Sequence, residues 1–261
     1  MSPQSGPLVT RRPGFLRLAR WYVRSRMKKN FDGVYLEGAP ALRRLLQAGP
    51  VIFAPTHVAW WDPLFAVRID EVLGAHSYAL MERVNLTRLP FFGWLGAIAI
   101  DRKNPREALG QLHASVALLD GPGKALWIFP QGEQRPAHLR PLGLKSGVAV
   151  LAESGGMPVI PLALNYLYRR TEKPAAFASF GQPIEPRGLS RRALLGAIEA
   201  GLESALGRID AFATRAEGDF EELSAPSANA AEPRAAKLLK PFRKEAENSA
   251  PSSRQKGAAR T

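Results

Sequence analysis

Short apolar runs alternate along this chain with segments whose apolar residues recur at helical spacing. The runs are bounded by turn residues and predict strands at Val34–Leu36, Val51–Ala54, His76–Leu80, Ala97–Ile100, Ala125–Phe129, Val159–Leu164 and Ala176–Phe180. The helical patterns lie near Ala41–Gln47, Pro63–Ile69, Pro105–Leu119, Lys145–Glu153 and Arg191–Arg215. Strands that alternate with helices in this way predict an α/β fold in which a mixed sheet is flanked by helices.

One of the predicted strands contains a proline. Pro161 lies within the apolar run Met157–Leu164, which reads MPVIPLAL. Because proline has no N–H to donate to a neighbouring strand, we expect a sheet edge, a bulge or a strand end there, beside a functional site.

The first 30 residues differ in composition from the rest. Residues 1–13 are rich in Pro, Ser and Gly, and we expect them to be disordered. Gly14–Asn30 combines apolar residues at helical spacing with arginines and lysines, and its Trp21 and Tyr22 suit a membrane interface. This pattern predicts a basic amphipathic helix that docks on the domain, contacts a membrane surface, or does both.

The last part of the chain is rich in Ala, Ser, Pro and Lys from about Ser224 onward. Such a composition predicts a basic disordered tail, within which a helical piece around Lys237–Arg243 can form. The predicted organisation is therefore an N-terminal segment over residues 1–30, one domain over 31–223 and a tail over 224–261.

The formal net charge of +13 is concentrated at the two ends. Residues 1–30 hold eight basic and no acidic residues, 224–261 hold eight basic and three acidic residues, and the middle holds twenty of each kind. A neutral body with basic ends predicts binding to an anionic membrane surface and argues against nucleic acid as a partner. The longest apolar stretch, Phe91–Ile100, is too short to cross a bilayer of about 30 Å as a helix. We therefore expect a peripheral or monotopic protein at the cytoplasmic face of a membrane.

The residue types present exclude several kinds of chemistry. The sequence has no cysteine, which excludes disulfides and a cysteine nucleophile. The four histidines lie far apart in the sequence and lack metal-ligand spacing, so we expect no metal site. A Gly-x-Ser-x-Gly elbow is also absent, which argues against a serine hydrolase.

The stretch Val51–Phe65, VIFAPTHVAWWDPLF, contains the most informative pair of residues. An apolar strand ends at Pro55, Thr56 offers a helix N-cap, and His57 and Asp62 follow with four residues between them. A histidine can accept a proton from a hydroxyl when a carboxylate fixes its tautomer and stabilises the charge that it gains. Without further signals, the same spacing also fits a surface histidine beside an aspartate that favours a helix dipole.

Two further stretches place polar residues after apolar runs. Gly96–Arg102 reads GAIAIDR and ends in Arg102, whose planar guanidinium suits a phosphate, although an arginine there is often only a surface ion pair. Trp127–Pro136 reads WIFPQGEQRP, in which Gly132 permits a sharp turn whose N–H groups can face an anion.

Together these stretches resemble the sequence blocks of the glycerolipid and lysophosphatidate acyltransferase superfamily. That family has His-x4-Asp, then a strand end like Gly-x-Ile-x-Ile-Asp-Arg, then Phe-Pro-Glu-Gly-Thr-Arg, then an apolar strand with a proline. Here the blocks read HVAWWD, GAIAIDR, FPQGEQR and VIPLAL in the same order, within a region of similarity from about residue 34 to 180. The combination is specific, although each block alone is weak.

The resemblance implies an O-acyltransferase of membrane lipid synthesis or remodelling. Its donor is an acyl thioester, either acyl-coenzyme A or acyl carrier protein, with no further cofactor, and its acceptor is the hydroxyl of a lysophospholipid such as lysophosphatidate. His57, oriented by Asp62, is the implied base. The residues implied to bind substrate are Arg102, Gln131, Gly132 and Arg135, with backbone N–H groups of the Gly132 loop facing the tetrahedral oxyanion.

The third block departs from the family pattern. Gln131 stands where the family has Glu, Gln134 stands where it has Arg, and Arg135 follows one position later. The departure leaves open a non-phosphate acceptor, such as a glycolipid, a terpenoid glycoside or an amine-headed lipid. A non-catalytic membrane- or nucleic-acid-binding module is a further alternative, which the intact His57 and Asp62 and the neutral body disfavour.

Overall fold

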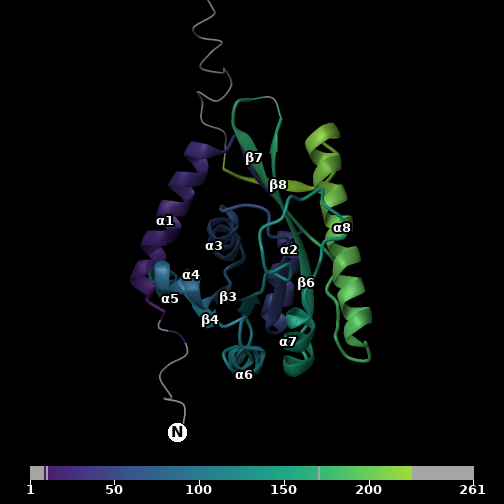
Figure 1. Cartoon of the computed structure of the whole chain (residues 1–261). Coiled ribbons are helices and arrows are strands. Elements are labelled where there is room, and N and C mark those ends of the chain that lie inside the picture. The colour runs from purple at the N-terminus through teal and green to yellow at the C-terminus, as the bar shows by residue number, and fades with distance from the viewer. Residues whose placement is uncertain (1–8, 10, 170, 225–261) are drawn as a thin grey trace, which may run out of the picture.

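An eight-stranded mixed sheet runs through the middle of the protein (Figure 1). We describe it from a computed structural model, in which residues 9, 11–169 and 171–224 are placed. The strands are β1 (Val34–Glu37), β2 (Val51–Pro55), β3 (His76–Glu82), β4 (Ala97–Ile100), β5 (Lys124–Trp127), β6 (Val159–Tyr168), β7 (Pro174–Phe180) and β8 (Phe220–Ser224). Their order is β4-β3-β5-β2-β6-β7-β1-β8. The pairs β6–β7 and β1–β8 are antiparallel and the others are parallel, so the predicted mixed sheet is confirmed.

Helices cover both faces of the sheet, with α1 on one side and α8 on the other (Figure 1). One apolar core packs against α1 (Pro13–Asn30), α2 (Ala39–Ala48) and α3 (Asp62–Leu73). A second core packs on the opposite face against α6 (Pro105–Val116), α7 (Gly147–Gly155) and α8 (Arg191–Arg215). Two short helices, α4 (Arg83–Arg88) and α5 (Phe91–Leu95), connect β3 to β4. The sequence pattern did not predict α4, α5 or β8.

The N-terminal helix docks on the domain. The side chains of Val23 and Met27 are each only 2% exposed and belong to the core that also contains α3 residues. Arg24 forms an ion pair with Glu71 of α3. The docked interpretation of the amphipathic helix is therefore confirmed. Trp21, by contrast, is 60% exposed, so that part of the apolar surface of α1 faces outward.

The prediction of disorder over the first 13 residues is wrong at its end. The backbone N–H of Arg12 donates to the carbonyl of Trp94 at 3.0 Å, and the Arg12 guanidinium lies 4.6 Å from the centre of the Trp94 ring. Pro13 then begins α1, because proline is well suited to the first turn of a helix, where no N–H partner is needed. At the other end, Ser224 closes β8, and the predicted tail with its helical piece at 237–243 lies outside the described residues.

Pro161 lies in the interior of the sheet, so the expectation of a sheet edge is wrong. It belongs to β6, between β2 and β7, and is paired with Ala54 of β2. Its carbonyl accepts a hydrogen bond from Gly181 at 2.8 Å, just beyond the end of β7. Because the nitrogen and the carbonyl of a strand residue point to the same side, the Pro161 nitrogen also points towards β7. The pairing of β6 with β7 begins only at Leu162. Proline is tolerated because its missing N–H points to where the ladder with β7 has not yet begun.

The parallel part of the sheet determines where side chains can meet. β2, β3, β4 and β5 are parallel neighbours, so their carboxyl ends lie along one edge. In open α/β sheets, ligands bind in the crevice beyond that edge, where neighbouring connections diverge. The segments that leave it contain His57, Arg102 and Gly132, which are far apart in the sequence. Within the described parts of the chain, no helix is both long and apolar enough to cross a membrane.

Candidate active site

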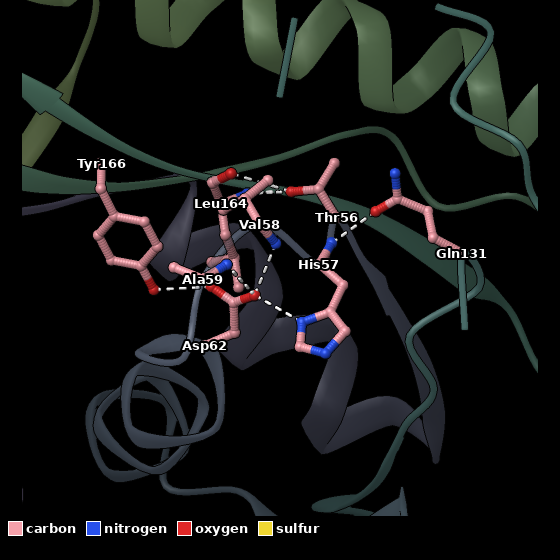
Figure 2. A network of polar contacts seen from close by, with 8 residues as sticks. All are labelled: Thr56, His57, Val58, Ala59, Asp62, Gln131, Leu164 and Tyr166. Atoms are coloured by element: carbon pink, nitrogen blue, oxygen red, sulfur yellow. Dashed lines mark hydrogen bonds and ion pairs between the residues drawn. The ribbon is translucent and has the colours of Figure 1, made fainter. Parts of the chain in front are cut away.

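His57 and Asp62 form a hydrogen-bonded pair between β2 and α3 (Figure 2). Nδ1 of His57 lies 2.7 Å from Oδ2 of Asp62. The Asp62 side chain is fully buried, whereas 20% of the His57 side chain is exposed. Since Nδ1 is engaged by the carboxylate, Nε2 is the ring nitrogen free to meet a substrate, and His57 lines a pocket.

Further donors fix the Asp62 carboxylate in place. The backbone N–H groups of Val58 and Ala59 donate to Oδ2 at 2.7 and 3.0 Å, and the Tyr166 hydroxyl donates to Oδ1 at 2.9 Å. Burial of a carboxylate is costly unless such partners compensate for lost water. The Asp62 side chain is thus hydrogen-bonded to the backbone of the loop that precedes it. Together with the Tyr166 hydroxyl, these bonds fix the position of the carboxylate.

Tyr166 was not singled out from the sequence, although it belongs to this site. Burial, together with the nearby Asp62 charge, raises the pKa of Tyr166 well above its usual value. The phenol therefore remains protonated and acts as a donor. Its position on β6, two residues beyond the apolar run that ends at Leu164, brings it across from α3. The signal available in the sequence was an aromatic residue with a polar tip two positions after the apolar run.

Thr56 does not cap a helix, contrary to expectation. Its hydroxyl donates to the carbonyl of Leu164 at 2.9 Å and accepts from the N–H of the same residue at 2.8 Å. The helix begins only at Asp62. Thr56 thus joins the end of β2 to β6 and fixes the backbone directly before His57.

The third sequence block supports the backbone around His57. The amide oxygen of Gln131 accepts the His57 N–H at 2.6 Å, and its amide nitrogen donates to the Leu142 carbonyl at 3.1 Å. The backbone N–H of Arg135 donates to the His57 carbonyl at 2.8 Å, and its guanidinium donates to the Leu142 carbonyl at 2.8 Å. Gln131 and Arg135 therefore connect the His57 loop to the loop at Leu142, and neither side chain lines the pocket.

Arg102 and Gly132 bring the second and third blocks together. The Arg102 guanidinium donates to the Gly132 carbonyl and lies against the glycine, where an added Cβ would lie 3.1 Å from its Nη2. Gly132 has a φ of +73°, a conformation that favours glycine. Its N–H donates to the Phe129 carbonyl at 3.0 Å, so this particular N–H is not available to an oxyanion.

A pocket of about 480 Å³ opens beside His57. Apolar residues from β3, β4, β5, α3 and α6 form most of its wall. Arg102, Lys145 and Glu82 also line it, and Lys145 was not predicted as a site residue. Of the predicted residues, His57, Arg102 and Gly132 line this pocket, and Asp62 lies behind His57. Among the described residues, no group of three or more His, Asp or Glu side chains is arranged to hold a metal ion.

This fold, with a His–Asp pair at the carboxyl edge of its sheet, is that of an acyltransferase. A family model described as Acyltransferase matches residues 34–165, just over half of the chain, and the chain belongs to that family. The predicted resemblance is thus confirmed.

Two curated relatives narrow the comparison within the family. The chain is similar to a 1-acyl-sn-glycerol-3-phosphate acyltransferase from Pseudomonas aeruginosa, with 33% identity over 120 residues that cover 44% of each chain. It is also similar to a 1-acyl-sn-glycerol-3-phosphate acyltransferase from Saccharomyces cerevisiae, with 30% identity over 86 residues that cover 31% of this chain and 28% of that one. The chain thus matches less than half the length of either relative.

Proposed function

We propose that this protein transfers a fatty acyl group from an acyl thioester to the hydroxyl of a lysophospholipid such as lysophosphatidate. The observation that carries the proposal is the 2.7 Å bond between His57 Nδ1 and the buried Asp62, beside an apolar pocket that His57 lines. The names of the two relatives, both 1-acyl-sn-glycerol-3-phosphate acyltransferases, support the same reaction class.

His57 is the general base in this mechanism. With its Nδ1–H donated to Asp62, Nε2 accepts the proton of the acceptor hydroxyl as that oxygen bonds to the thioester carbonyl carbon. The resulting tetrahedral intermediate collapses, the carbon–sulfur bond breaks, and the protonated His57 returns its proton to the departing thiolate. The Asp62 carboxylate stabilises the imidazolium, while the hydrogen bond from Tyr166 helps to hold that carboxylate in place.

The oxyanion of the tetrahedral intermediate requires donors beside His57. The Gly132 N–H closes the turn to Phe129, so it does not serve this purpose. Backbone N–H groups of the 129–134 segment other than that of Gly132 are the proposed donors, since this loop is held against the His57 backbone by Gln131 and Arg135.

Arg102 and Lys145 are the proposed ligands of the acceptor phosphate. Both line the pocket, and charge-assisted bonds to phosphate are stronger than neutral ones. Gln131 and Arg135, the altered residues of the third block, instead bond to the backbone of His57 and Leu142. The departure of these two residues from the family pattern therefore affects the structure of the loop and is no argument against a phosphate-bearing acceptor. We favour such an acceptor over a neutral lipid alcohol.

A membrane surface is the proposed partner of α1 and the two short helices. Trp21 is 60% exposed, Val84 of α4 is 48% exposed and Phe91 of α5 is 37% exposed. Phe91 also contacts Phe15 of α1, which joins these helices into one surface. Because α4 and α5 contribute to the pocket wall through Asn85, Phe92 and Leu95, a lipid acceptor could enter from that surface.

The proposed function is tested by assaying the purified protein with acyl-coenzyme A and lysophosphatidate. We expect His57→Ala to lower turnover by at least about 100-fold, the usual scale for the loss of a general base. Monoacylglycerol, which lacks the phosphate, serves as the control acceptor and should react poorly. Near-normal turnover by His57→Ala would refute the mechanism, and rapid acylation of monoacylglycerol without any of lysophosphatidate would refute the acceptor.

A further inference from the structure

The inner part of the pocket contains a polar cluster that the proposed reaction does not use. Asp70 of α3 accepts hydrogen bonds from the Ser77 hydroxyl at 2.7 Å and from the Trp127 indole N–H at 3.0 Å. All three residues line the same pocket as His57. A substrate bound beside His57 can therefore contact this cluster.

The Asp70 carboxylate keeps one oxygen open to a further donor. Both of these hydrogen bonds end on Oδ1, and in the described residues no hydrogen bond ends on Oδ2. The side chain is enclosed by the protein yet keeps some accessible surface, and Asp70 belongs to the pocket wall. The charges of Arg11 and Arg20 act on Asp70 from nearby, but among the described residues no hydrogen bond joins either of them to Asp70. An acceptor atom at this depth favours a ligand that brings a donor.

One stripe of α3 connects His57 with Asp70. Pro63, Ala66, Val67 and Asp70 all line the pocket, and their spacing places them on a single face of the helix. The first three are apolar, and Asp70 ends the stripe. At a rise of about 1.5 Å per residue, the stripe is about 10 Å long, roughly the length of an extended chain of eight to ten carbons.

We propose that the acyl chain of the donor lies along this stripe and that the Asp70–Ser77 cluster binds a hydroxyl group on its far part. This inference rests on the proposed acyl transfer. A plain chain that reached Asp70 would remove water from the carboxylate and give no hydrogen bond in return, whereas a hydroxyl would donate to Oδ2. The cluster thus disfavours long unsubstituted chains and favours a medium-length hydroxyacyl chain.

The test measures binding separately from catalysis. Decanoyl-, ω-hydroxydecanoyl- and hexadecanoyl-coenzyme A are titrated by calorimetry into full-length His57→Ala protein, which should not turn them over. We expect the hydroxylated chain to bind about tenfold more tightly than decanoyl, as one hydrogen bond to a charged group implies, and hexadecanoyl to bind more weakly than decanoyl.

Variants at the cluster identify the residue responsible. Asp70→Leu should abolish the preference for the hydroxylated chain and improve hexadecanoyl binding. Asp120→Asn removes an exposed carboxylate outside the pocket and should change nothing.

Two results would overturn the inference. One is equal affinity for decanoyl and ω-hydroxydecanoyl chains, and the other is tighter binding of hexadecanoyl than of decanoyl. Both comparisons use the His57→Ala protein alone and need no variant at Asp70 to fold. Transfer to lysophosphatidate by the wild-type protein is assayed in parallel, so that loss of the proposed reaction is distinguished from loss of the chain preference.

Discussion

Replacement of Asp70 by asparagine should make the protein more stable at neutral pH. Burial raises the pKa of the Asp70 carboxyl from 3.8 to about 6, and the bonds from Ser77 and Trp127, together with the charges of Arg11 and Arg20, only partly oppose this effect. Asparagine has an Oδ1 that can accept the same two bonds. The substitution therefore removes a buried charge and retains the hydrogen bonds.

The size of the effect follows from the difference between the folded and unfolded states. Between about pH 4 and pH 6, folded Asp70 holds a proton that the unfolded chain has released, so the contribution of this group to stability is lost as the pH rises. A shift of about two pKa units corresponds to about 3 kcal/mol. We expect the free energy of unfolding of Asp70→Asn to exceed that of the wild type by up to about 3 kcal/mol above pH 7 and to match it near pH 4.

Urea unfolding of both proteins at pH 4.5, 6 and 7.5 measures this difference, which should grow with pH. Other carboxylates titrate alike in both proteins, so the difference isolates Asp70. Asp120→Asn is the matched control, because the Asp120 side chain is 73% exposed and its difference from the wild type should not vary in this way. A difference that is constant with pH, or a destabilised variant at pH 7.5, would contradict the reasoning.

The remaining predictions concern the site and the membrane. Tyr166→Phe removes one hydrogen bond to the buried Asp62 carboxylate and should lower kcat about tenfold with little change in KM. Arg102→Gln and Lys145→Gln should each raise the KM for lysophosphatidate about tenfold and leave that of the acyl donor unchanged, because each removes a proposed charged ligand of the phosphate. Trp21→Ser should weaken sedimentation with anionic vesicles, while the salt dependence from the basic residues of α1 remains.

Each of these predictions has an outcome that would contradict it. An unchanged kcat for Tyr166→Phe would show that Asp62 is held without the phenol, and equal effects of Arg102→Gln on both substrates would argue against a phosphate ligand. For the membrane, Tyr168→Ser is the matched control, since Tyr168 is 74% exposed at the end of β6. If both aromatic variants bind vesicles equally, Trp21 does not contribute to membrane binding.

Local signals in the sequence were sufficient for most of the fold. The β-favouring runs marked seven of the eight strands in the described part of the chain, since buried parallel strands are almost continuously apolar. β8, which reads FEELS, carries two glutamates and forms as an edge strand by pairing with β1, so its own composition gave no strand signal. The short α4 and α5 contain too few residues to show helical periodicity.

The candidate site was only partly predictable from the sequence. The spacing of residues along the chain predicts contacts between near neighbours in sequence, but not contacts between residues on different strands of the sheet. His57 and Asp62 are five residues apart, and their pairing followed from that spacing. Tyr166 reaches Asp62 across 104 residues, and Lys145 joins Arg102 in the pocket wall only once the strands are assembled. Neither contact leaves a local pattern in the sequence.

The altered residues of the third block can be explained by the hydrogen bonds that they make in the structure. Gln131 must accept from the His57 N–H and donate to the Leu142 carbonyl at the same time. A carboxylate accepts but cannot donate, so an amide suits this position once Leu142 offers an acceptor. Arg135 donates to the same carbonyl and supplies a second connection between the two loops. Gln131 and Arg135 therefore have a structural role in holding the loop at His57, and this role does not depend on which acceptor is bound.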